Sequence, residues 1–184
     1  SLKEDAQAAI AELRALGIQT VMLTGDNPRA AAHIAAQVGI DKVHAGVLPS
    51  GKVEVIRQLQ AEYGQWVAMV GDGINDAPAL KQANIGIAIG SGADVAMEAA
   101  DVILIGGRLM GLVEAAQLSR LTFRKIVENL IWASAYNVAA IPIAAAGLLH
   151  PMIGVIAMPA SSLSVIVNSL QLKRASLSAI HKTQ

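Results

Sequence analysis

Two long apolar stretches at the carboxyl end constrain this chain most. Residues 130–149 and 151–172 contain no Asp, Glu, Lys or Arg. A helix needs about 20 residues to cross the apolar core of a bilayer, so each stretch is long enough to span it once. His150-Pro151 lies between them and favours a tight turn, because proline cannot continue the incoming helix. The sequence therefore predicts a membrane-spanning hairpin.

Basic residues flank the predicted hairpin and indicate its orientation. Three precede it and two follow it: Arg120, Arg124, Lys125, Lys173 and Arg174. By the positive-inside rule, residues 1–128 and the C-terminus then lie in the cytoplasm, and His150 faces the opposite side. The alternative is an apolar hairpin buried in a soluble core, where two adjacent charge-free runs of this length are rare.

Composition agrees with a chain that lies partly outside water. Charged residues make up 15% of it, against about 25% in a typical soluble domain. The net formal charge is zero and there is no basic tract, so nucleic-acid binding is not indicated. The chain contains no cysteine, which excludes disulfides and thiolate metal ligands within it.

Helical and strand patterns alternate before the hairpin. Periodicity predicts helices over 3–16, with Gly17 as the C-cap, and over 28–38, 50–62, 75–82 and 94–99. It predicts strands over 19–23, 42–45, 66–70, 85–89 and 102–105, and a further helix over 109–127 that runs into the first span. This alternation argues for one parallel α/β sheet. In such sheets the chemistry lies at the carboxyl ends of the strands.

The hexapeptide Gly71-Asp72-Gly73-Ile74-Asn75-Asp76 follows one of these strands and leads into a helix. Its two carboxylates and its amide supply the oxygen ligands that Mg²⁺ prefers. Its glycines allow the backbone to approach a phosphate closely. Asp-Gly alone is often only a turn. The whole hexapeptide, followed by Ala-Pro-Ala-Leu, favours a site for Mg²⁺ and phosphate.

Thr24-Gly25-Asp26 ends an earlier predicted strand. A hydroxyl and backbone amides at a strand end can hold phosphoryl oxygens. Asp26-Asn27-Pro28 is equally consistent with a helix N-cap and nothing more.

Lys52 stands near the start of the helix predicted over 50–62. There it can direct a compact positive charge at a phosphate. An isolated lysine is usually a solvated surface residue, which is the alternative. Gly51-Lys52 is not a P-loop, because Val53 stands where Ser or Thr is required.

The order of hydroxyl, lysine and paired acids resembles the haloacid-dehalogenase-like phosphotransferases. The motifs Thr-Gly-Asp-Asn and Gly-Asp-Gly-Ile-Asn-Asp resemble those of the P-type ATPase branch of this superfamily. In that family an aspartate in Asp-Lys-Thr-Gly-Thr attacks ATP and becomes an aspartyl-phosphate. That motif is absent here, as are the nucleotide-binding domain and the Thr-Gly-Glu actuator motif. By the family's layout all three precede residue 1.

The resemblance implies roles for individual residues. Thr24 would hydrogen-bond the aspartyl-phosphate, and Lys52 would neutralise phosphate charge. Asn75 and Asp76 would hold the phosphate and the metal shell. The implied catalytic residues are Thr24, Gly25, Asp26, Lys52, Asn75 and Asp76, and the implied Mg²⁺ ligands are Asp72 and Asp76.

Polar side chains inside the predicted spans point to a transported ion. Tyr136 and Asn137 lie in the first span, and Met158 and Ser162 share a helix face in the second. A thioether is a soft ligand suited to Cu(I). Ser161 is three residues from Met158 and Ser162 is four, so Ser161 can share the same helix face nearly as well. Helix packing is the alternative, because small residues are common between membrane helices.

The pattern Tyr-Asn in one span, with Met-x-x-Ser-Ser and Asn-Ser-Leu in the next, resembles the copper-exporting P-type ATPases. Zinc- and cadmium-type members place a lysine and an aspartate in these spans, and this chain has neither. The resemblance implies a Cu(I) path lined by Tyr136, Asn137, Met158 and Ser162, with Ag(I) not separable from Cu(I). A Cys-Pro-Cys motif upstream would supply the strongest ligands.

The predicted protein is part of an ATP- and Mg²⁺-dependent copper export pump in a bacterial inner membrane. Its partners are ATP, monovalent copper, the lipid bilayer, and the rest of the pump, with its actuator domain, nucleotide-binding domain and other membrane helices. The predicted parts are a phosphorylation-domain segment (1–106), a connecting helix (107–128), two spans (129–149 and 151–172) and a cytoplasmic tail (173–184).

Two alternatives remain. One is a membrane-anchored phosphatase of the same fold, against which the polar residues in the spans argue, because a plain anchor needs none. The other is a non-catalytic fragment that binds or regulates another protein, which the missing nucleophile keeps open.

Overall fold

The structure is a computed structural model that describes residues 2–64, 66–71, 74–90, 98–147, 159 and 162–170. The chain divides into two compact units, Ser1–Val113 and Glu114–Gln184. The first unit is an α/β assembly and the second is helical where it is described.

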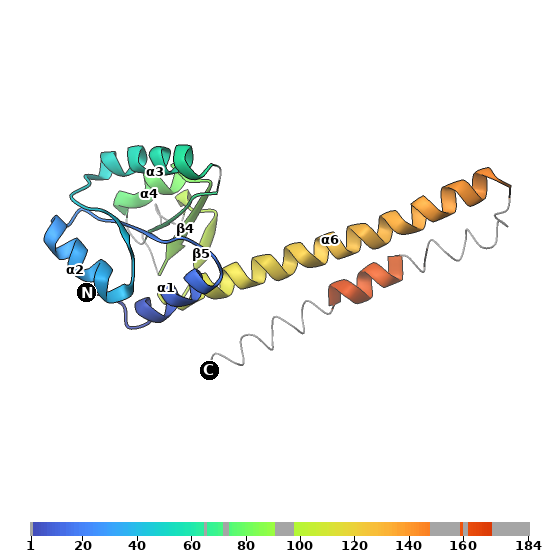
Figure 1. Cartoon of the computed structure of the whole chain (residues 1–184), viewed down its shortest axis with the longest axis horizontal. Coiled ribbons are helices and arrows are strands. Elements are labelled where there is room, and N and C mark those ends of the chain that lie inside the picture. The colour runs from blue at the N-terminus through green and yellow to red at the C-terminus, as the bar shows by residue number, and fades with distance from the viewer. Residues whose placement is uncertain are drawn as a thin grey trace. The chain divides into compact units, whose positions relative to one another are not determined.

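Helices and strands alternate through the first unit (Figure 1). In chain order they are α1 (Ala6–Ala15), β1 (Val21–Leu23), α2 (Pro28–Val38), β2 (Lys42–His44), α3 (Pro49–Tyr63), β3 (Ala68–Gly71), the 3₁₀ turn η1 (Ile74–Asp76), α4 (Ala77–Gln82), β4 (Ile85–Ile89) and β5 (Val102–Leu104), followed by α6 (Met110–Ala145). Of the helix predicted over 94–99, residues 94–97 lie outside the described part of the chain.

The first helix begins three residues later than its periodicity predicts, because the preceding side chains bind elsewhere. The carboxylate of Asp5 accepts a hydrogen bond from the N–H of Met110 at 2.7 Å, and the ammonium of Lys3 donates to the carbonyl of Gly107. Asp5 therefore caps the N-terminus of α6 from a distant part of the sequence. At the other end of α1 the C-cap residue is Leu16, and the predicted cap Gly17 follows it with a φ of 73°, a conformation that glycine adopts readily after a helix.

All strand pairs are parallel, as the α/β pattern predicts, but the described strands form two sheets instead of one. Val21 of β1 lies opposite Lys42 of β2, and the second sheet has the order β3-β4-β5. In the described residues no ladder joins β1 to β3, so each keeps an unpaired edge. Side-chain packing connects the two sheets instead.

That packing centres on a cluster of buried side chains from α3, β3 and α4: Ile56, Met69, Ala79 and Leu80. Leu23 of β1 packs against this cluster, which ties the first sheet to the second. Helices α3 and α4 lie together on one side of the strands (Figure 1). The carboxyl ends of β1 and β3 are thus fixed through a shared core.

Gly86 lets helix α4 approach strand β4 closely. A Cβ at this position would lie 2.7 Å from the carbonyl oxygen of Leu80, a distance that real Cβ atoms do not reach. Asp101 holds the same residue from another side, because its carboxylate accepts the Gly86 N–H at 2.8 Å. The N–H of Asp101 donates in turn to the Gly86 carbonyl at 2.8 Å. The height of α4 over the sheet is therefore set by backbone contact.

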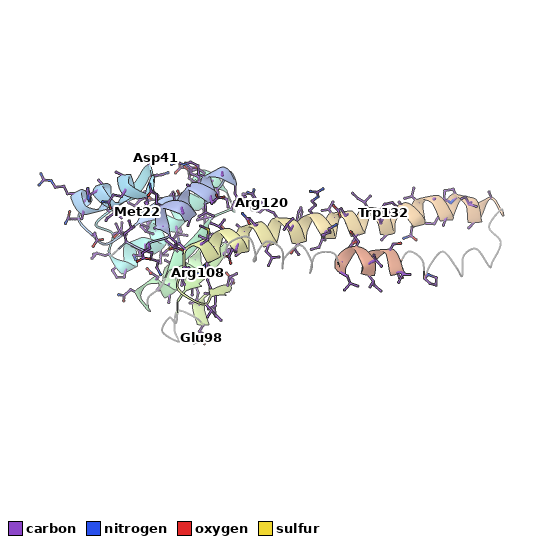
Figure 2. The ribbon with its side chains drawn as sticks, turned by 90° about the horizontal axis from the view of Figure 1, so that it is seen from below. Met22, Asp41, Glu98, Arg108, Arg120 and Trp132 are labelled. Atoms are coloured by element: carbon purple, nitrogen blue, oxygen red, sulfur yellow. The ribbon has the colours of Figure 1, made fainter. Side chains whose placement is uncertain are left out.

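Helix α6 runs without interruption for 36 residues and joins the predicted connecting helix to the predicted first span. Side chains project from it along its length, and Trp132 is 58% exposed (Figure 2). Among the described residues it is the one helix long and apolar enough to cross a membrane. Of the predicted second span, only residue 159 and the helical residues 162–170 are described.

Candidate active site

The first predicted site group lies directly after β1. The hydroxyl of Thr24 donates to Oδ2 of Asp26 at 3.0 Å, and the N–H of Asp26 donates back to Oγ1 of Thr24 at 3.1 Å. The capping role belongs to the next residue, because Oδ1 of Asn27 accepts the Ala30 N–H at 2.9 Å at the start of α2. The cap of α2 therefore does not explain the hydrogen-bonded pair of Thr24 and Asp26.

The second group forms around Lys52, in the first turn of α3. Its ammonium lies 2.6 Å from Oδ1 of Asp76. The two side chains are only 16% and 12% exposed, so Lys52 is not a solvated surface lysine. Burying the two charges costs desolvation free energy. We therefore interpret the pair as holding the Lys52 ammonium in a fixed position.

Gly71, the last residue of β3, makes room for this ion pair. A Cβ on Gly71 would lie 2.8 Å from the Cβ of Asp76 and 2.9 Å from its Oδ2. Asp76 ends the 3₁₀ turn η1, which returns its carboxylate to the carboxyl end of β3. It is the one charged side chain that is buried in the described part of the chain.

The structure thus places two site groups at the carboxyl ends of parallel strands, as predicted. The N–H of Val47 donates to the carbonyl of Thr24 at 3.0 Å, which ties the first group to the segment leading into α3. Gly25 lies beside the Val47 carbonyl, at 3.5 Å from where its Cβ would stand. Asn75, which precedes Asp76 in η1, is exposed. Asp72 lies outside the described residues.

The donor chemistry around Asp76 fits a magnesium ion. Carboxylate and amide oxygens are the ligands that Mg²⁺ prefers, and Asp76 and Asn75 both offer them here. In the described residues no three acidic, histidine or cysteine side chains gather into a metal-binding group. The described arrangement is therefore one lysine anchored by one buried carboxylate.

Of the predicted metal-path residues, two have described side chains. The amide nitrogen of Asn137 donates to the carbonyl of Ala133 in the same helix at 3.1 Å. Ser162 begins the described helical segment 162–170. Tyr136 lies in α6, but its side chain is outside the described part, as is Met158.

Comparison with known proteins identifies the family. A family model for haloacid dehalogenase-like hydrolases matches residues 1–84. A probable copper-exporting P-type ATPase V from Mycobacterium tuberculosis is 57% identical over 95% of this chain and 22% of its own length. A copper-exporting P-type ATPase from Staphylococcus epidermidis is 55% identical over 96% of this chain and 22% of its own. The chain belongs to the heavy-metal P-type ATPases.

Solved structures agree with this assignment. A zinc-transporting PIB-type ATPase in an E2.Pi state matches 94% of this P-type ATPase chain and 28% of its own, with a TM-score of 0.87 and 44% identity. The catalytic domain of a CPx-ATPase, CopB-B, matches 58% of the chain with a TM-score of 0.54 and 30% identity. The chain spans about a fifth of the length of the curated relatives that it matches.

Several residues that shape this ATPase segment do not stand out in its sequence. Gly71 and Gly86 act through the absence of a Cβ, and a glycine near a strand end signals that only weakly. Asp101 and Asp5 bind backbone groups across 15 and 105 residues of sequence. Asn129 is the one with a usable signal, because it is polar and stands at the edge of a charge-free run.

Proposed function

We propose that this chain forms part of the phosphorylation domain and two membrane helices of a Cu(I)-exporting P-type ATPase. The pump would hydrolyse ATP through an aspartyl-phosphate and move Cu(I), or Ag(I) by the same chemistry, out of the cytoplasm. Residues 1–106 would belong to the phosphorylation domain, 107–128 would connect it to the membrane, and 129–149 and 151–172 would be the spans. Residues 173–184 would form a cytoplasmic tail.

The ion pair of Lys52 with Asp76 carries this proposal. It fixes a positive charge at the carboxyl end of β3, where the parallel strands of such folds present their chemistry. Phosphoryl transfer is catalysed mainly by positioned charges that stabilise the phosphoryl oxygens. A lysine held by a buried carboxylate meets that need, because it is already oriented before the phosphate arrives.

The nucleophile would come from a strand between the two sheets. Strands β1 and β3 each lack a partner on one edge, and both pack on the same core. A strand from elsewhere in the pump that paired with these edges would join the sheets. Its carboxyl end would place an aspartate beside Thr24 and Lys52. The actuator domain, the nucleotide-binding domain and the other membrane helices would be the remaining partners.

Magnesium would be held by Asp72 and Asp76, with Asn75 ordering the shell. The ion supplies charge neutralisation for the phosphoryl group when bound. The groups described here would act beside it: the Thr24 hydroxyl would donate to a phosphoryl oxygen, with Gly25 and Asp26 lining that loop. Lys52 would contact another oxygen while Asp76 keeps its ammonium in place.

Copper would pass between the helices near Asn137, with Tyr136, Met158 and Ser162 as the other proposed lining residues. The Asn137 nitrogen is used within its own helix, so the oxygen Oδ1 is the atom that would face the ion. Both spans lack charged residues, so a divalent ion would meet no compensating charge in them. That supports monovalent copper over the zinc named for one structural relative.

The phosphorylation step is tested by acid-stable, hydroxylamine-sensitive labelling from ATP. The 184-residue chain should give no label, because the nucleophile is not in it, and a full-length pump carrying this chain should give one. Lys52→Ala in the pump should lower the label at least tenfold, whereas Lys81→Ala, on the exposed side of α4, should not. Labelling of the 184-residue chain would show that the nucleophile is misplaced.

The copper path is tested by metal-stimulated ATP hydrolysis in the same pump. Met158→Leu keeps volume and removes the sulfur, and Asn137→Leu removes the amide. Both should reduce stimulation by Cu(I), whereas Val138→Leu, which is 72% exposed on the same helix, should leave it unchanged. If both variants keep wild-type Cu(I) dependence, these residues are packing residues.

The inner-membrane hairpin is tested by cysteine labelling. The chain has no cysteine of its own, so His150→Cys supplies a single reporter in it. The proposed topology requires modification from the face opposite to the cytoplasm. Modification only from the cytoplasmic face would overturn it.

A further inference from the structure

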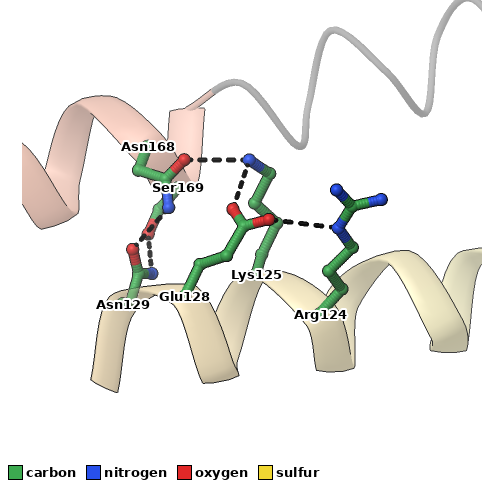
Figure 3. Close-up of polar contacts among 6 residues, drawn as sticks. All are labelled: Arg124, Lys125, Glu128, Asn129, Asn168 and Ser169. Carbon is green, nitrogen blue, oxygen red and sulfur yellow. Dashed lines mark hydrogen bonds and ion pairs between the residues drawn. The ribbon is translucent and has the colours of Figure 1, made fainter. Parts of the chain in front are cut away.

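A closed set of polar contacts joins α6 to the helical segment 162–170 (Figure 3). The nitrogen of Asn168 donates to the oxygen of Asn129 at 2.8 Å, and the nitrogen of Asn129 donates to the hydroxyl of Ser169 at 2.9 Å. Lys125 donates to the oxygen of Asn168 at 2.9 Å. Each asparagine amide therefore uses both its donor and its acceptor across the helix pair.

An ion pair steadies the lysine in this set. Lys125 lies 2.8 Å from Glu128, which also lies 3.1 Å from Arg124. The carboxylate of Glu128 thus balances positive charge beside the two asparagines. An anionic ligand would have to displace this carboxylate, which argues against a phosphate or lipid-headgroup site. The contacts are better explained as a bond between two helices, and we call them the asparagine clasp.

Burial follows the same faces of the two helices. Along α6 the half-buried positions include Thr122, Lys125, Asn129 and Ala133, spaced three or four residues apart. Along the partner, Val165 and Asn168 are half-buried while their neighbours are exposed. Such spacing places each set on one helix face. Among the described residues, the clasp therefore lies on the face along which the two helices meet.

We propose that Asn129 and Asn168 are positioning residues that fix the register of the two membrane helices, and so hold Asn137 and Ser162 at one depth. This inference rests on the proposed copper path. Asn137 lies eight residues beyond Asn129 in α6, about 12 Å along the axis at 1.5 Å per residue. Ser162 lies six residues before Asn168, about 9 Å along the antiparallel partner. The clasp therefore leaves these two residues only about 3 Å apart in depth.

Two apolar helices have little else to define their register, because lipid chains solvate leucine and isoleucine as well as a neighbouring helix does. A slip of one turn moves one helix by about 5.4 Å relative to the other. Such a slip would unpair both asparagine amides and remove the hydrogen bond from Lys125 to Asn168. A slip that moves Ser162 toward the clasp would separate it from Asn137 by about 8 Å in depth, and a shared ion could no longer contact both.

The register can be measured by disulfide cross-linking of the 184-residue chain in phosphatidylcholine vesicles. Ala133→Cys with Val165→Cys reports the observed register, and Ala133→Cys with Ser162→Cys reports a slip of about one turn. The first pair should cross-link in strong preference to the second. Asn129→Leu, or Asn129→Leu with Asn168→Leu, should lower that preference about threefold to tenfold, in line with the strength of interhelical hydrogen bonds in bilayers.

A matched control separates the clasp from a general loss of polarity. Asn137→Leu is the same substitution two turns along α6, but the bond it removes is internal to its helix. It should leave the cross-linking preference unchanged. Asn129→Gln, which keeps an amide, should restore part of the preference. An unchanged ratio in the double leucine variant would overturn the proposal.

Copper-stimulated ATP hydrolysis in the full-length pump then tests the positioning role. Asn129→Leu should raise the Cu(I) concentration needed for half-maximal stimulation, while phosphoenzyme formation from inorganic phosphate, which needs no copper, stays intact. Relaxed register with unchanged copper dependence would overturn the link to the ion path. Failure of the copper path itself would appear separately, as wild-type Cu(I) dependence in Asn137→Leu.

Discussion

Key side chains of the α/β unit bind partners far away in the sequence, whereas several polar side chains of α6 bind partners within one turn of their own helix. Lys52 and Asp76 are 24 residues apart, and Asp101 reaches Gly86 across 15. In α6, Arg124 binds Glu128 four residues away, and Asn137 binds Ala133. The asparagine clasp and the cap that Asp5 places on Met110 are the exceptions in α6. The difference implies that single substitutions disrupt the two regions by different routes.

The largest effect is expected when the buried ion pair is broken. Lys52→Ala leaves Asp76 charged and without its cation, which costs about 3 kcal/mol or more. Helix α6, held by its own turns, should be unaffected. Hydrogen exchange in the 184-residue chain should show faster exchange of α3 and β3 amides and unchanged exchange between residues 118 and 135.

Lys81→Ala is the control, because this lysine is exposed on α4. Equal protection of α3 in both variants would show that the ion pair contributes nothing to the stability of the unit. Faster exchange along α6 in Lys52→Ala would break the contrast between the two regions.

Two glycine-to-alanine substitutions sharpen the same contrast. Gly86→Ala forces a methyl group against the Leu80 carbonyl and should destabilise the α/β unit by about 1–3 kcal/mol. Gly111→Ala, in the first turn of α6, meets nothing nearer than Leu104 Cδ1 at 3.9 Å. It should stabilise the helix by up to about 1 kcal/mol, because alanine favours helices over glycine. Urea titration with hydrogen-exchange readout measures both, and equal signs would contradict the prediction.

The start of α6 depends on the α/β unit for its cap. Asp5→Ala removes the acceptor for the Met110 N–H, and this should cost about 1 kcal/mol and fray the first turn of α6. Asp41→Ala removes an exposed ion pair with Arg14 and should cost less than about 0.5 kcal/mol. Exchange rates of the amides of residues 110–113 distinguish the two. Similar rates in both variants would show that Asp5 is not a cap.

The smallest effect is expected from the exposed pair of Lys42 and Glu62. Hydrogen bonding to Lys42 lowers the pKa of Glu62 below 4.5, and hydrogen bonding to Glu62 raises the pKa of Lys42 above 10.5. The carboxylate therefore adds stability above its unfolded pKa, and this is lost as the pH falls through its folded value. The lysine contribution is present below 10.5 and is lost as the pH rises through its folded value.

Glu62→Gln tests this pH dependence by urea unfolding across both ranges. At acidic pH the free energy of unfolding depends on pH partly through this carboxylate, and the variant should lose that part of the dependence. Because the two side chains are 31% and 51% exposed, the change should be small and should weaken further in high salt. A pH profile identical to that of the parent chain would show that the pair is not formed.

Local patterns were sufficient to locate the elements and to nominate candidate site residues. Alternating periodicity located every described helix and strand, because burial of one face imposes a period of 3.6 or 2 on the sequence. The motif after β3 pointed to Asp76, and the position after Pro49-Ser50-Gly51 pointed to Lys52. Both remain proposed catalytic residues. The sequence also indicated a membrane hairpin, since a charge-free run of 20 residues is a property of composition alone.

Only the tertiary structure decided which of these residues meet. It paired Lys52 with Asp76, where sequence left a solvated lysine open, and it separated the predicted single sheet into two. It also joined Asn129 to Asn168, across 39 residues. Such pairings depend on how strands and helices pack over long sequence separations. Local periodicity fixes the face on which a side chain lies, but only packing decides which partner lies opposite that face.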